Sequence, residues 1–545
     1  MKRSCRVSAS VTHGLRLSGF KEFGKISVAV VEALEEEPWK VEEELASAYA
    51  ERGPAALSDF TRRASFLLVD HAAGEIHAAR DPVGLGSLFF ADTRQGTTIA
   101  NDIALLIRPG DKLSVCPKGL IQYLTFQYTP APFTLLSGVQ KLHPGEVRTN
   151  RIHDGALVGV QRLSPLRFGS NTLSGRELED VFGEVYGQLR DSVAGRKVGV
   201  LASGGVDSTT NALWLKRVGA EPVLLTASFQ DPEFDETPYV RDLSAHLGLS
   251  LRTHVVTAQP RGDLARLIGF LAEPICDRAL IPTGALLSAC GHDLSSIVSG
   301  EGGDELWGPP RRWPAHVDLA APFLTASDLA STYLRASAAT SIDDRRHMLS
   351  SSLAAEIEEE QDRAAKLLES LMVAAEPQDC FQAVKAAQIG TWLPENVIAK
   401  DRAAADVIGA RPRFPLAHRL CMQFVAGLSN HEHLRGCSGK ELLRSFHRGS
   451  VPESVWSKPK HKFKVPPGTW LTQPVAEQVC RRIRDGGTGL DRFFSAHFID
   501  SLAAEASRLD DRLVWGIHTL TEWLDAIKAR AGSTIHDETD ISHTA

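Results

Sequence analysis

The chain has 545 residues, more than one hydrophobic core usually holds, so we expect at least two domains. Its 43% hydrophobic and 23% charged residues are typical of a soluble globular protein, and no apolar run reaches the length of about eighteen residues that a membrane span needs. The 60 basic and 67 acidic residues give a net charge of −7, which disfavours a general nucleic-acid or membrane-surface binder.

The cysteines suggest a reducing compartment. All eight stand outside Cys-x-x-Cys pairs and outside His/Cys spacings suited to zinc, so we expect free thiols. The basic start Met1-Lys2-Arg3 is not followed by the apolar segment of a signal peptide. We therefore expect a cytoplasmic protein without nucleic-acid or membrane partners.

The first part of the chain, residues 1–165, is predicted to be rich in strands. Alternating or continuous apolar stretches cover residues 25–31, 64–70 and 88–90, and turns rich in Gly, Asp and Pro separate them. This pattern indicates a β-rich domain.

The next strand, predicted at residues 197–201, ends in a loop of small residues. Ser203-Gly204-Gly205-Val206-Asp207-Ser208 combines two glycines, two hydroxyls and the start of a helix, a pattern typical of a phosphate-binding loop. A carboxylate beside a phosphate is repulsive unless a divalent cation lies between them, so Asp207 suggests Mg²⁺. The alternative is an ordinary Ser/Gly-rich turn with an N-cap.

Strands and helices then alternate. Strands are predicted at residues 222–229, 251–256 and 295–299, with a helix at 237–247. This order predicts an α/β domain with a doubly wound parallel sheet, in which ligands bind beyond the carboxyl ends of the strands.

The last of these strands also ends in a glycine-rich turn, and this turn is acidic. Glu301, Asp304 and Glu305 lie within five residues of one another and repel unless a cation is bound. A solvated acidic turn is the alternative. A shared Mg²⁺ held by Asp207 and Asp304 explains both turns at once.

Together these motifs resemble the asparagine synthetase family. Residues 203–208 are similar to the pyrophosphatase loop of ATP-dependent synthetases, and residues 299–305 to the matching segment of asparagine synthetases. Residues 393–402 resemble the segment that closes over the nucleotide, and residues 458–466 the family's late basic loop. The resemblance implies an ATP-pyrophosphatase fold with a helical lobe, over residues 166–530.

The resemblance also implies roles. ATP would adenylylate a carboxylate, and a nitrogen nucleophile would then displace AMP. Glu301 is expected to be a general base or an amine anchor, and Lys460 to stabilise both steps. Nucleotide contacts are implied for Leu201, Ser203, Gly204, Gly205, Asp207, Ser208, Ser228, Ser299 and Gly300, and metal ligation for Asp207 and Asp304.

Residues 80–90 and 134–145 resemble framework segments of the class II glutamine amidotransferase domain, a four-layered αββα sandwich with an N-terminal nucleophile. That family's nucleophile is a cysteine following the initiator Met, where this sequence has Lys2, and Cys5 lies too far along. No Asn-Gly-Glu stretch of the family's glutamine pocket is present. We expect a degenerate domain that does not hydrolyse glutamine and serves as a scaffold or docking surface.

The C-terminal region is predicted to be helical from about residue 320 to 430, and residues 531–545 to be a polar, disordered tail. Where the family carries an acid and then an aspartate, this chain has Gly409 and Leu416, so the substrate pocket is expected to differ. Lys458, Lys462 and Lys464 are expected on a solvated edge.

Two branches of the family lack a glutaminase, the β-lactam synthetases and the lasso peptide cyclases. The β-lactam branch typically has a tyrosine at the position of Glu301, so we favour a lasso peptide cyclase that forms a macrolactam within a precursor peptide. Such an enzyme implies a leader-peptide-binding protein and a leader peptidase as partners. The alternatives are an ammonia-dependent or β-lactam synthetase-like ligase acting on a small molecule, and an inactive ATP-binding scaffold.

Overall fold

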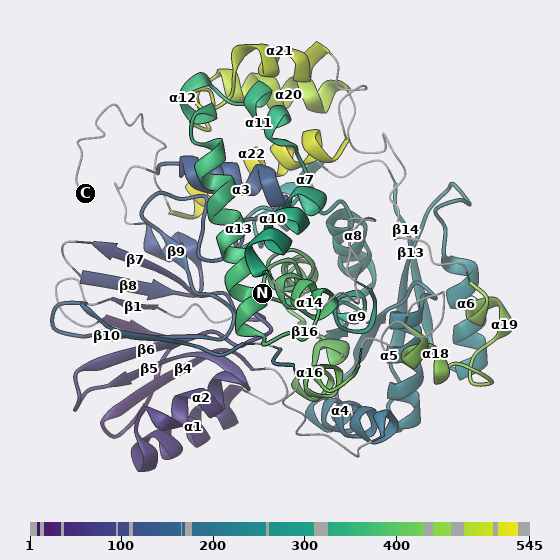
Figure 1. The fold of residues 1–545 in the computed structure, drawn as a ribbon. Helices are drawn as coiled ribbons and strands as arrows, with labels where there is room; N and C mark the ends of the chain where they lie inside the picture. The colour runs from purple at the N-terminus through teal and green to yellow at the C-terminus, as the bar shows by residue number, and fades with distance from the viewer. Residues whose placement is uncertain are drawn as a thin grey trace.

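The structure is a computed structural model that describes residues 8–10, 16–33, 38–93, 96–107, 113–164, 166–168, 177–257, 261–309, 325–429, 440–458, 473–504 and 511–531. Figure 1 shows an antiparallel sandwich on the left, a parallel sheet on the right and helices between and above them.

The N-terminal sandwich consists of two antiparallel sheets. The first has the strand order β2(Arg16–Ser18), β1(Ser8–Ser10), β8(Gly96–Ala100), β7(Phe89–Thr93) and β9(Gln140–Lys141). The second has the order β11(Leu157–Arg162), β10(Glu146–Arg151), β6(Glu75–Ala79), β5(Ala64–Asp70), β4(Ile26–Ala33) and β3(Lys21–Phe23).

Both faces of the second sheet are covered, which explains the continuous apolar run of β5. Phe66 and Leu68 pack with helices α1(Pro38–Arg52) and α2(Ala55–Thr61), whereas Leu67 and Val69 pack between the two sheets. Because side chains alternate along a strand, one apolar run serves two cores. On the other side of the first sheet, Phe89 packs with helix α3(Pro117–Phe126) and the short helix η1(Ile103–Leu106).

The parallel sheet has the order β14(Leu251–Val255), β13(Val223–Ser228), β12(Val198–Leu201), β15(Ser296–Val298) and β16(Arg411–Arg413). The chain moves outward from β12 to β14 and then returns to the other side of β12 at β15. The order therefore reverses between β12 and β15, which is where ligands bind in open α/β sheets.

Helices cover both faces of this sheet. One face packs against α4(Leu178–Ser192) and α5(Val206–Arg217), and the other against α8(Leu280–Cys290). Helix α6(Thr237–Leu247) connects β13 to β14, and α7(Arg261–Ile268) precedes α8. Strand β16 was not predicted, whereas β12 to β15 and α6 follow the predicted pattern closely.

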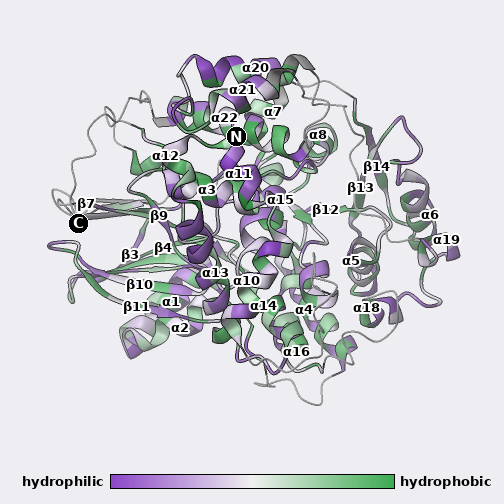
Figure 2. Cartoon of the chain, turned by 45° about the horizontal axis from the view of Figure 1, so that its top comes forward, coloured by the Kyte–Doolittle hydropathy of each residue, from purple (hydrophilic) through white to green (hydrophobic). Residues whose placement is uncertain are grey.

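The remaining helices include those of the helical lobe, and also α18(Glu441–Ser445) and α19(Glu453–Trp456), which lie beside α5 and α6 (Figure 1). They are α9(Gly303–Trp307), α10(Ala326–Ser337), α11(Ile342–Met348), α12(Ser351–Ala354), α13(Ile357–Ala374), α14(Cys380–Gly390), the π-helix η2(Leu393–Ile398), α15(Ala399–Asp406), η3(Pro415–Ala417), α16(Arg419–Ala426), α18(Glu441–Ser445), α19(Glu453–Trp456), α20(Gln473–Arg484), α21(Ala496–Ala504) and α22(Asp511–Ala531). Surface helices such as α20 carry hydrophobic and hydrophilic residues, as Figure 2 shows.

The architecture confirms the predicted fold class, an αββα sandwich followed by a parallel α/β sheet with a helical lobe. Within the part of the chain that the structure describes, no helix is both long and apolar enough to cross a membrane.

Candidate active site

A cavity of about 340 Å³ lies where the strand order reverses. Both predicted turns line it, the first after β12 and the second after β15. Residues of η2, α15, α18 and the segment before α8 complete the wall, among them Asp277, Val397, Lys400, Asp401, Lys440 and Lys458. The cavity therefore combines residues that are far apart in the sequence, from Leu201 to Lys458.

The first turn has the form of an anion-binding loop. Gly204 has φ +69°, and a Cβ there would lie 2.7 Å from Cβ of Tyr239, so both conformation and space require glycine. The N–H of Gly205 donates to the hydroxyl of Ser203 at 3.2 Å, and the N–H of Ser203 to that of Ser208 at 3.2 Å. The loop leads into α5, whose N-terminal end favours anions.

The second turn approaches the first very closely. A Cβ on Gly300 would lie 3.0 Å from Cβ of Asp207, and one on Gly303 would lie 2.4 Å from its carboxylate. Asn211 of α5 fixes this approach, since its side-chain amide donates to the carbonyl of Ser299 at 2.9 Å. The glycines of the acidic turn thus bring Asp304 to the phosphate loop.

Asp207 and Asp304 share one cation, the ammonium of Lys440. Lys440 Nζ lies 2.5 Å from Asp207 Oδ2 and 2.7 Å from Asp304 Oδ1. Burial disfavours the charged lysine, but the two carboxylates outweigh this effect and raise the pKa of Lys440 to about 12. The two acids predicted to hold Mg²⁺ are therefore close enough to share a single cation.

This geometry fits a magnesium ion delivered with a nucleotide. Asp207 and Asp304 would supply two carboxylate ligands, and Mg²⁺ commonly takes one or two carboxylates together with phosphate oxygens. Bound there, the ion would neutralise phosphate charge. Among the described residues, no His, Cys, Asp or Glu group of three or more could hold a metal by itself.

A second charged cluster lies beside the acidic turn. Lys400 forms an ion pair with Glu301, and its Nζ lies 3.5 Å from Asp401 Oδ1 and 3.8 Å from Asp277 Oδ2. The hydroxyl of Ser299 donates to Asp401. Burial raises the pKa of Asp401 to about 6, against the effect of Lys400, and the surrounding acids raise the pKa of Lys400 well above its usual value despite its burial.

Lys458 corrects one prediction. It was expected on a solvated edge, but its side chain is buried and its Nζ lies 2.6 Å from Glu236 Oε1 and 2.5 Å from the carbonyl of Ser203. The phosphate loop and α6 surround it, so it is part of the cavity wall. Lys460, predicted to be catalytic, lies outside the described residues, as do Lys462 and Lys464.

The cavity brings together most of the predicted site residues. Its lining includes Leu201, Ser203, Gly204, Gly205, Asp207, Ser208, Ser299, Gly300, Glu301 and Asp304. Ser228 is not among the lining residues; it ends β13, and its carbonyl accepts a hydrogen bond from Val256 at 2.9 Å.

Sequence reasoning missed the cations and the acids of the opposite wall. Lys400 and Asp401 stand in the segment that resembled the family, where two charged residues inside an apolar helical stretch were a usable signal. Lys440 follows a short Ser-Gly stretch that carries no such signal.

The two positions at which this chain lacks the acids of the family lie away from the cavity. Gly409 has φ +69° in the turn after α15, a conformation that favours glycine. Leu416 is fully buried in the core, and its carbonyl accepts a hydrogen bond from Trp307 Nε1 at 3.1 Å. Neither residue lines the cavity.

Comparison with known proteins agrees with this geometry. A family model described as asparagine synthase matches residues 184–525, and one described as a glutamine amidotransferase domain matches residues 41–158. Asparagine synthetase [glutamine-hydrolyzing] 1 of Bacillus subtilis (strain 168) is 22% identical over an alignment of 511 residues, and the match covers 88% of this chain and 80% of that protein.

Putative asparagine synthetases [glutamine-hydrolyzing] of Mycobacterium bovis and Mycobacterium tuberculosis are 29% identical over 276 residues, 49% of this chain and 42% of theirs. The asparagine synthase model covers more than half of the chain, including both turns and the charged wall around Lys400. The chain therefore belongs to the asparagine synthase family of ATP-dependent ligases, which form carbon–nitrogen bonds through an AMP-forming activation.

Proposed function

We propose that this chain is a macrolactam synthetase of the lasso peptide cyclase type. It activates an Asp or Glu side-chain carboxylate of a precursor peptide with ATP, which forms an acyl adenylate and releases pyrophosphate. The peptide's N-terminal amine then attacks the activated carbonyl, which forms the amide and releases AMP and a proton.

The observation that carries this proposal is the charge of the wall beside Glu301. One ammonium, that of Lys400, is shared by three carboxylates. A substrate amine is protonated at neutral pH and is attracted by this surplus of negative charge. A free amino acid also carries an α-carboxylate, which needs a cation as its partner. The ammonium of Lys400 is already paired with the three acids. The wall therefore favours a substrate whose reacting end is an amine.

The first step needs positive charge around the phosphates. The N–H groups of the loop, the hydroxyls of Ser203 and Ser208, and the ammonium groups of Lys440 and Lys458 lie on one side of the cavity. They orient the nucleotide so that the carboxylate attacks the α-phosphorus in line with the departing pyrophosphate.

The second step needs a group that accepts the amine proton. Glu301 lines the cavity and is ion-paired with Lys400, which holds its carboxylate in place. A fixed carboxylate at this position binds the ammonium of the substrate and takes its proton as the amide forms.

The nitrogen comes from the substrate and not from glutamine under this proposal. In support, the sequence holds no Asn-Gly-Glu stretch, which in the related amidotransferases builds the glutamine pocket. Partners would be the precursor peptide, a leader-peptide-binding protein and a leader peptidase.

Pyrophosphate exchange tests the proposal. The purified chain is incubated with ATP, Mg²⁺, labelled pyrophosphate and a peptide encoded by a short reading frame beside its gene. We expect peptide-dependent exchange that Asp207→Ala abolishes, and a product lighter than the peptide by one water. An N-acetylated peptide should support exchange but give no macrolactam.

A second candidate is an ammonia-dependent asparagine synthetase-like ligase. The relatives support its asparagine synthetase-like part, since they are named asparagine synthetase [glutamine-hydrolyzing] and putative asparagine synthetase [glutamine-hydrolyzing]. Formation of asparagine from aspartate and ammonia at a rate above that of the peptide reaction would decide for it. Absence of exchange with every carboxylate offered would instead indicate an inactive scaffold.

A further inference from the structure

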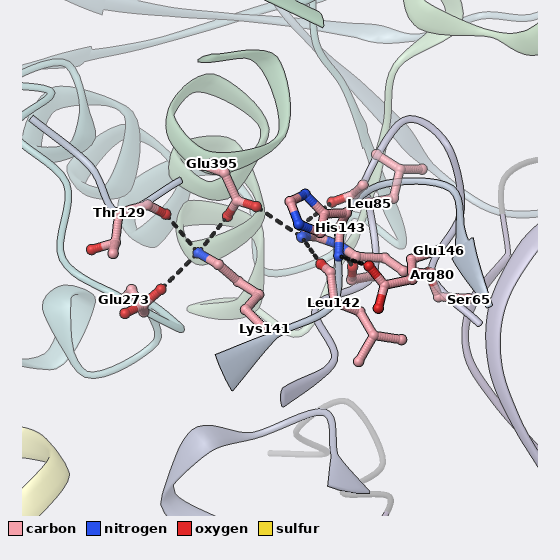
Figure 3. A network of polar contacts seen from close by, with 12 residues as sticks. Ser65, Arg80, Leu85, Thr129, Lys141, Leu142, His143, Glu146, Glu273 and Glu395 are labelled. Carbon is pink, nitrogen blue, oxygen red and sulfur yellow. Dashed lines mark hydrogen bonds and ion pairs between the residues drawn. The ribbon is translucent and has the colours of Figure 1, made fainter. Parts of the chain in front are cut away.

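A buried network of charged side chains joins the sandwich to the ligase part of the chain (Figure 3). Arg80 and Lys141 come from the sandwich, whereas Glu273 precedes α8 and Glu395 belongs to η2. None of the four is more than 7% exposed. Ions buried to this degree are costly unless they are fully paired, so the network fixes the relative position of the segments that contribute to it.

Both cations of the network are paired with carboxylates and backbone carbonyls. Lys141 Nζ donates to Glu273 Oε2 at 2.6 Å, to Glu395 Oε2 at 2.8 Å and to the carbonyl of Thr129 at 2.7 Å. Arg80 Nη1 donates to the other oxygen of Glu395 at 2.8 Å, and the rest of its guanidinium binds backbone carbonyls. Burial disfavours the charge on Glu395, but the two cations outweigh it and lower its pKa.

Both carboxylates stand next to residues of the active-site wall. Glu273 lies four residues before Asp277. The N–H of Leu135, in the sandwich part, also donates to Glu273 Oε1 at 2.8 Å. The N–H of Cys276 donates to the carbonyl of Gln127 at 2.9 Å, which fixes the residue adjoining Asp277. The sandwich part therefore holds this segment at three points.

The second segment is held in the same way. Helix η2 contains Glu395 and continues without interruption into α15, which carries Lys400. The two segments also meet each other, since the side-chain amide of Asn396 donates to Asp277 Oδ2 at 3.4 Å. The phosphate loop, in contrast, is packed against Tyr239 and hydrogen-bonded to Lys458, which both belong to the ligase part.

We infer that Arg80 and Lys141 of the sandwich are positioning residues for the acceptor wall, the segments 273–279 and 393–401 that carry Asp277 and Lys400. They contact no substrate themselves. Without them the wall loses its fixed geometry, while the phosphate loop keeps its own supports. The sandwich thus serves the ligase reaction directly, whether or not it has a reaction of its own. The part concerning substrate use rests on the proposed function.

Hydrogen–deuterium exchange of the full chain tests the structural part without any carboxylate substrate. We expect Lys141→Met to raise exchange at least fivefold in peptides covering 273–279 and 393–401, with peptides covering 202–208 unchanged. The dissociation constant of Mg·ATP should stay within twofold of the wild-type value. Because Lys141→Met leaves two acids in a buried site, Glu273→Gln provides a milder variant with the same direction of change.

A matched control is available on the surface. Arg167 forms an exposed ion pair with Glu376, at 2.5 Å between Arg167 Nη2 and Glu376 Oε1, so Arg167→Ala should leave exchange in both segments unchanged. Unchanged exchange at 273–279 and 393–401 in Lys141→Met and Glu273→Gln would overturn the inference, as would equal loosening of the phosphate loop.

The catalytic readout uses whichever carboxylate supports pyrophosphate exchange. In Glu273→Gln we expect the KM for that substrate to rise at least tenfold and the KM for ATP to stay within twofold. An equal loss in both would indicate a general folding defect and contradict a positioning role. If no carboxylate supports exchange, the proposed function fails, and the deuterium result still decides the structural inference.

Discussion

Asp207 of the phosphate loop and Asp304 of the acidic turn bind the same ammonium, that of Lys440, at 2.5 and 2.7 Å. Both carboxylates are partly exposed, yet two so close together would repel each other, and the buried lysine removes this repulsion. Lys440 and a magnesium ion therefore compete for the same pair of acids.

We predict that Lys440→Met exposes this competition. Without the ammonium the two acids should bind Mg²⁺ in the absence of nucleotide, because a divalent cation then relieves their repulsion. Millimolar Mg²⁺ should raise the melting temperature of Lys440→Met by about 2 °C or more, in line with a stabilisation of about 1 kcal/mol. The wild type and Lys440→Arg should not respond. An equal response in all three would contradict the competition.

The phosphate loop offers a second prediction, through Lys458. Its ammonium contacts both the carbonyl of Ser203 and Glu236, so Lys458→Met removes a support of the loop and leaves Glu236 without this cation in the cavity wall. We expect the KM for ATP to rise by about tenfold, equivalent to about 1.4 kcal/mol, with little change in the KM for the carboxylate. The opposite pattern would place Lys458 on the acceptor side.

Behind the acidic turn, Lys385 holds the end of α9. Its fully buried Nζ donates to the carbonyls of Glu305, Leu306 and Gly308 at 2.8, 2.5 and 2.8 Å. Lys385→Met leaves three buried acceptors unsatisfied, and we expect the free energy of unfolding to fall by about 3 kcal/mol or more. Urea unfolding followed by tryptophan fluorescence measures this, with exposed Lys366→Met, expected within about 0.5 kcal/mol of the wild type, as the control.

Substitution of two glycines should allow the cost of backbone strain to be measured separately from the cost of steric overlap between the sandwich and η2. Gly84 has φ +72°, and a Cβ there would lie 2.5 Å from Cβ of Pro394; Gly138 has φ +75° with nothing within 4 Å. Gly138→Ala should therefore cost only the left-handed conformation, about 1 kcal/mol. Gly84→Ala should cost about 2 kcal/mol more, measured by the same urea unfolding. Equal losses of unfolding free energy in the two variants would mean that Pro394 moves to make room for the added methyl group at position 84.

The pH dependence of stability should include His447. Burial, together with Arg444 and Arg217, lowers its pKa to about 4, so the folded protein holds it neutral. The unfolded chain binds a proton more readily between about pH 4 and 6.5, so the free energy of unfolding falls as the pH falls through this window. His447→Gln should reduce that slope by about 1.4 kcal/mol per pH unit. An unchanged slope in pH-dependent urea unfolding would show that His447 is charged when folded.

The sequence predicts those parts of the site whose signal is local. Buried apolar runs ending in Ser203-Gly204-Gly205 and Gly300-Glu301-Gly302 mark two strand ends, and backbone geometry leaves few residue types that fit there. Strand β16 escapes prediction because Arg411-Pro412-Arg413 has little strand character, and its extended form comes from pairing with β15.

The cations of the site were beyond local prediction. Lys440 reaches Asp207 across 233 positions of sequence, and Lys458 reaches Ser203 across 255. A lysine in a polar stretch is ordinarily solvated, and only the folded chain places these two against carboxylates and carbonyls. Lys458, predicted on a solvated edge, shows how tertiary packing overrides composition.

The cross-domain pairing of Arg80 and Lys141 with Glu273 and Glu395 bears on how such a chain can evolve. An amidotransferase reaction can be lost through a change at a single nucleophile, with no effect on folding. Removal of the whole sandwich would instead leave Glu273 and Glu395 without their partner cations and would expose the surfaces that pack against the sandwich. Selection for the ligase reaction therefore also acts on the sandwich residues that hold the acceptor wall in place.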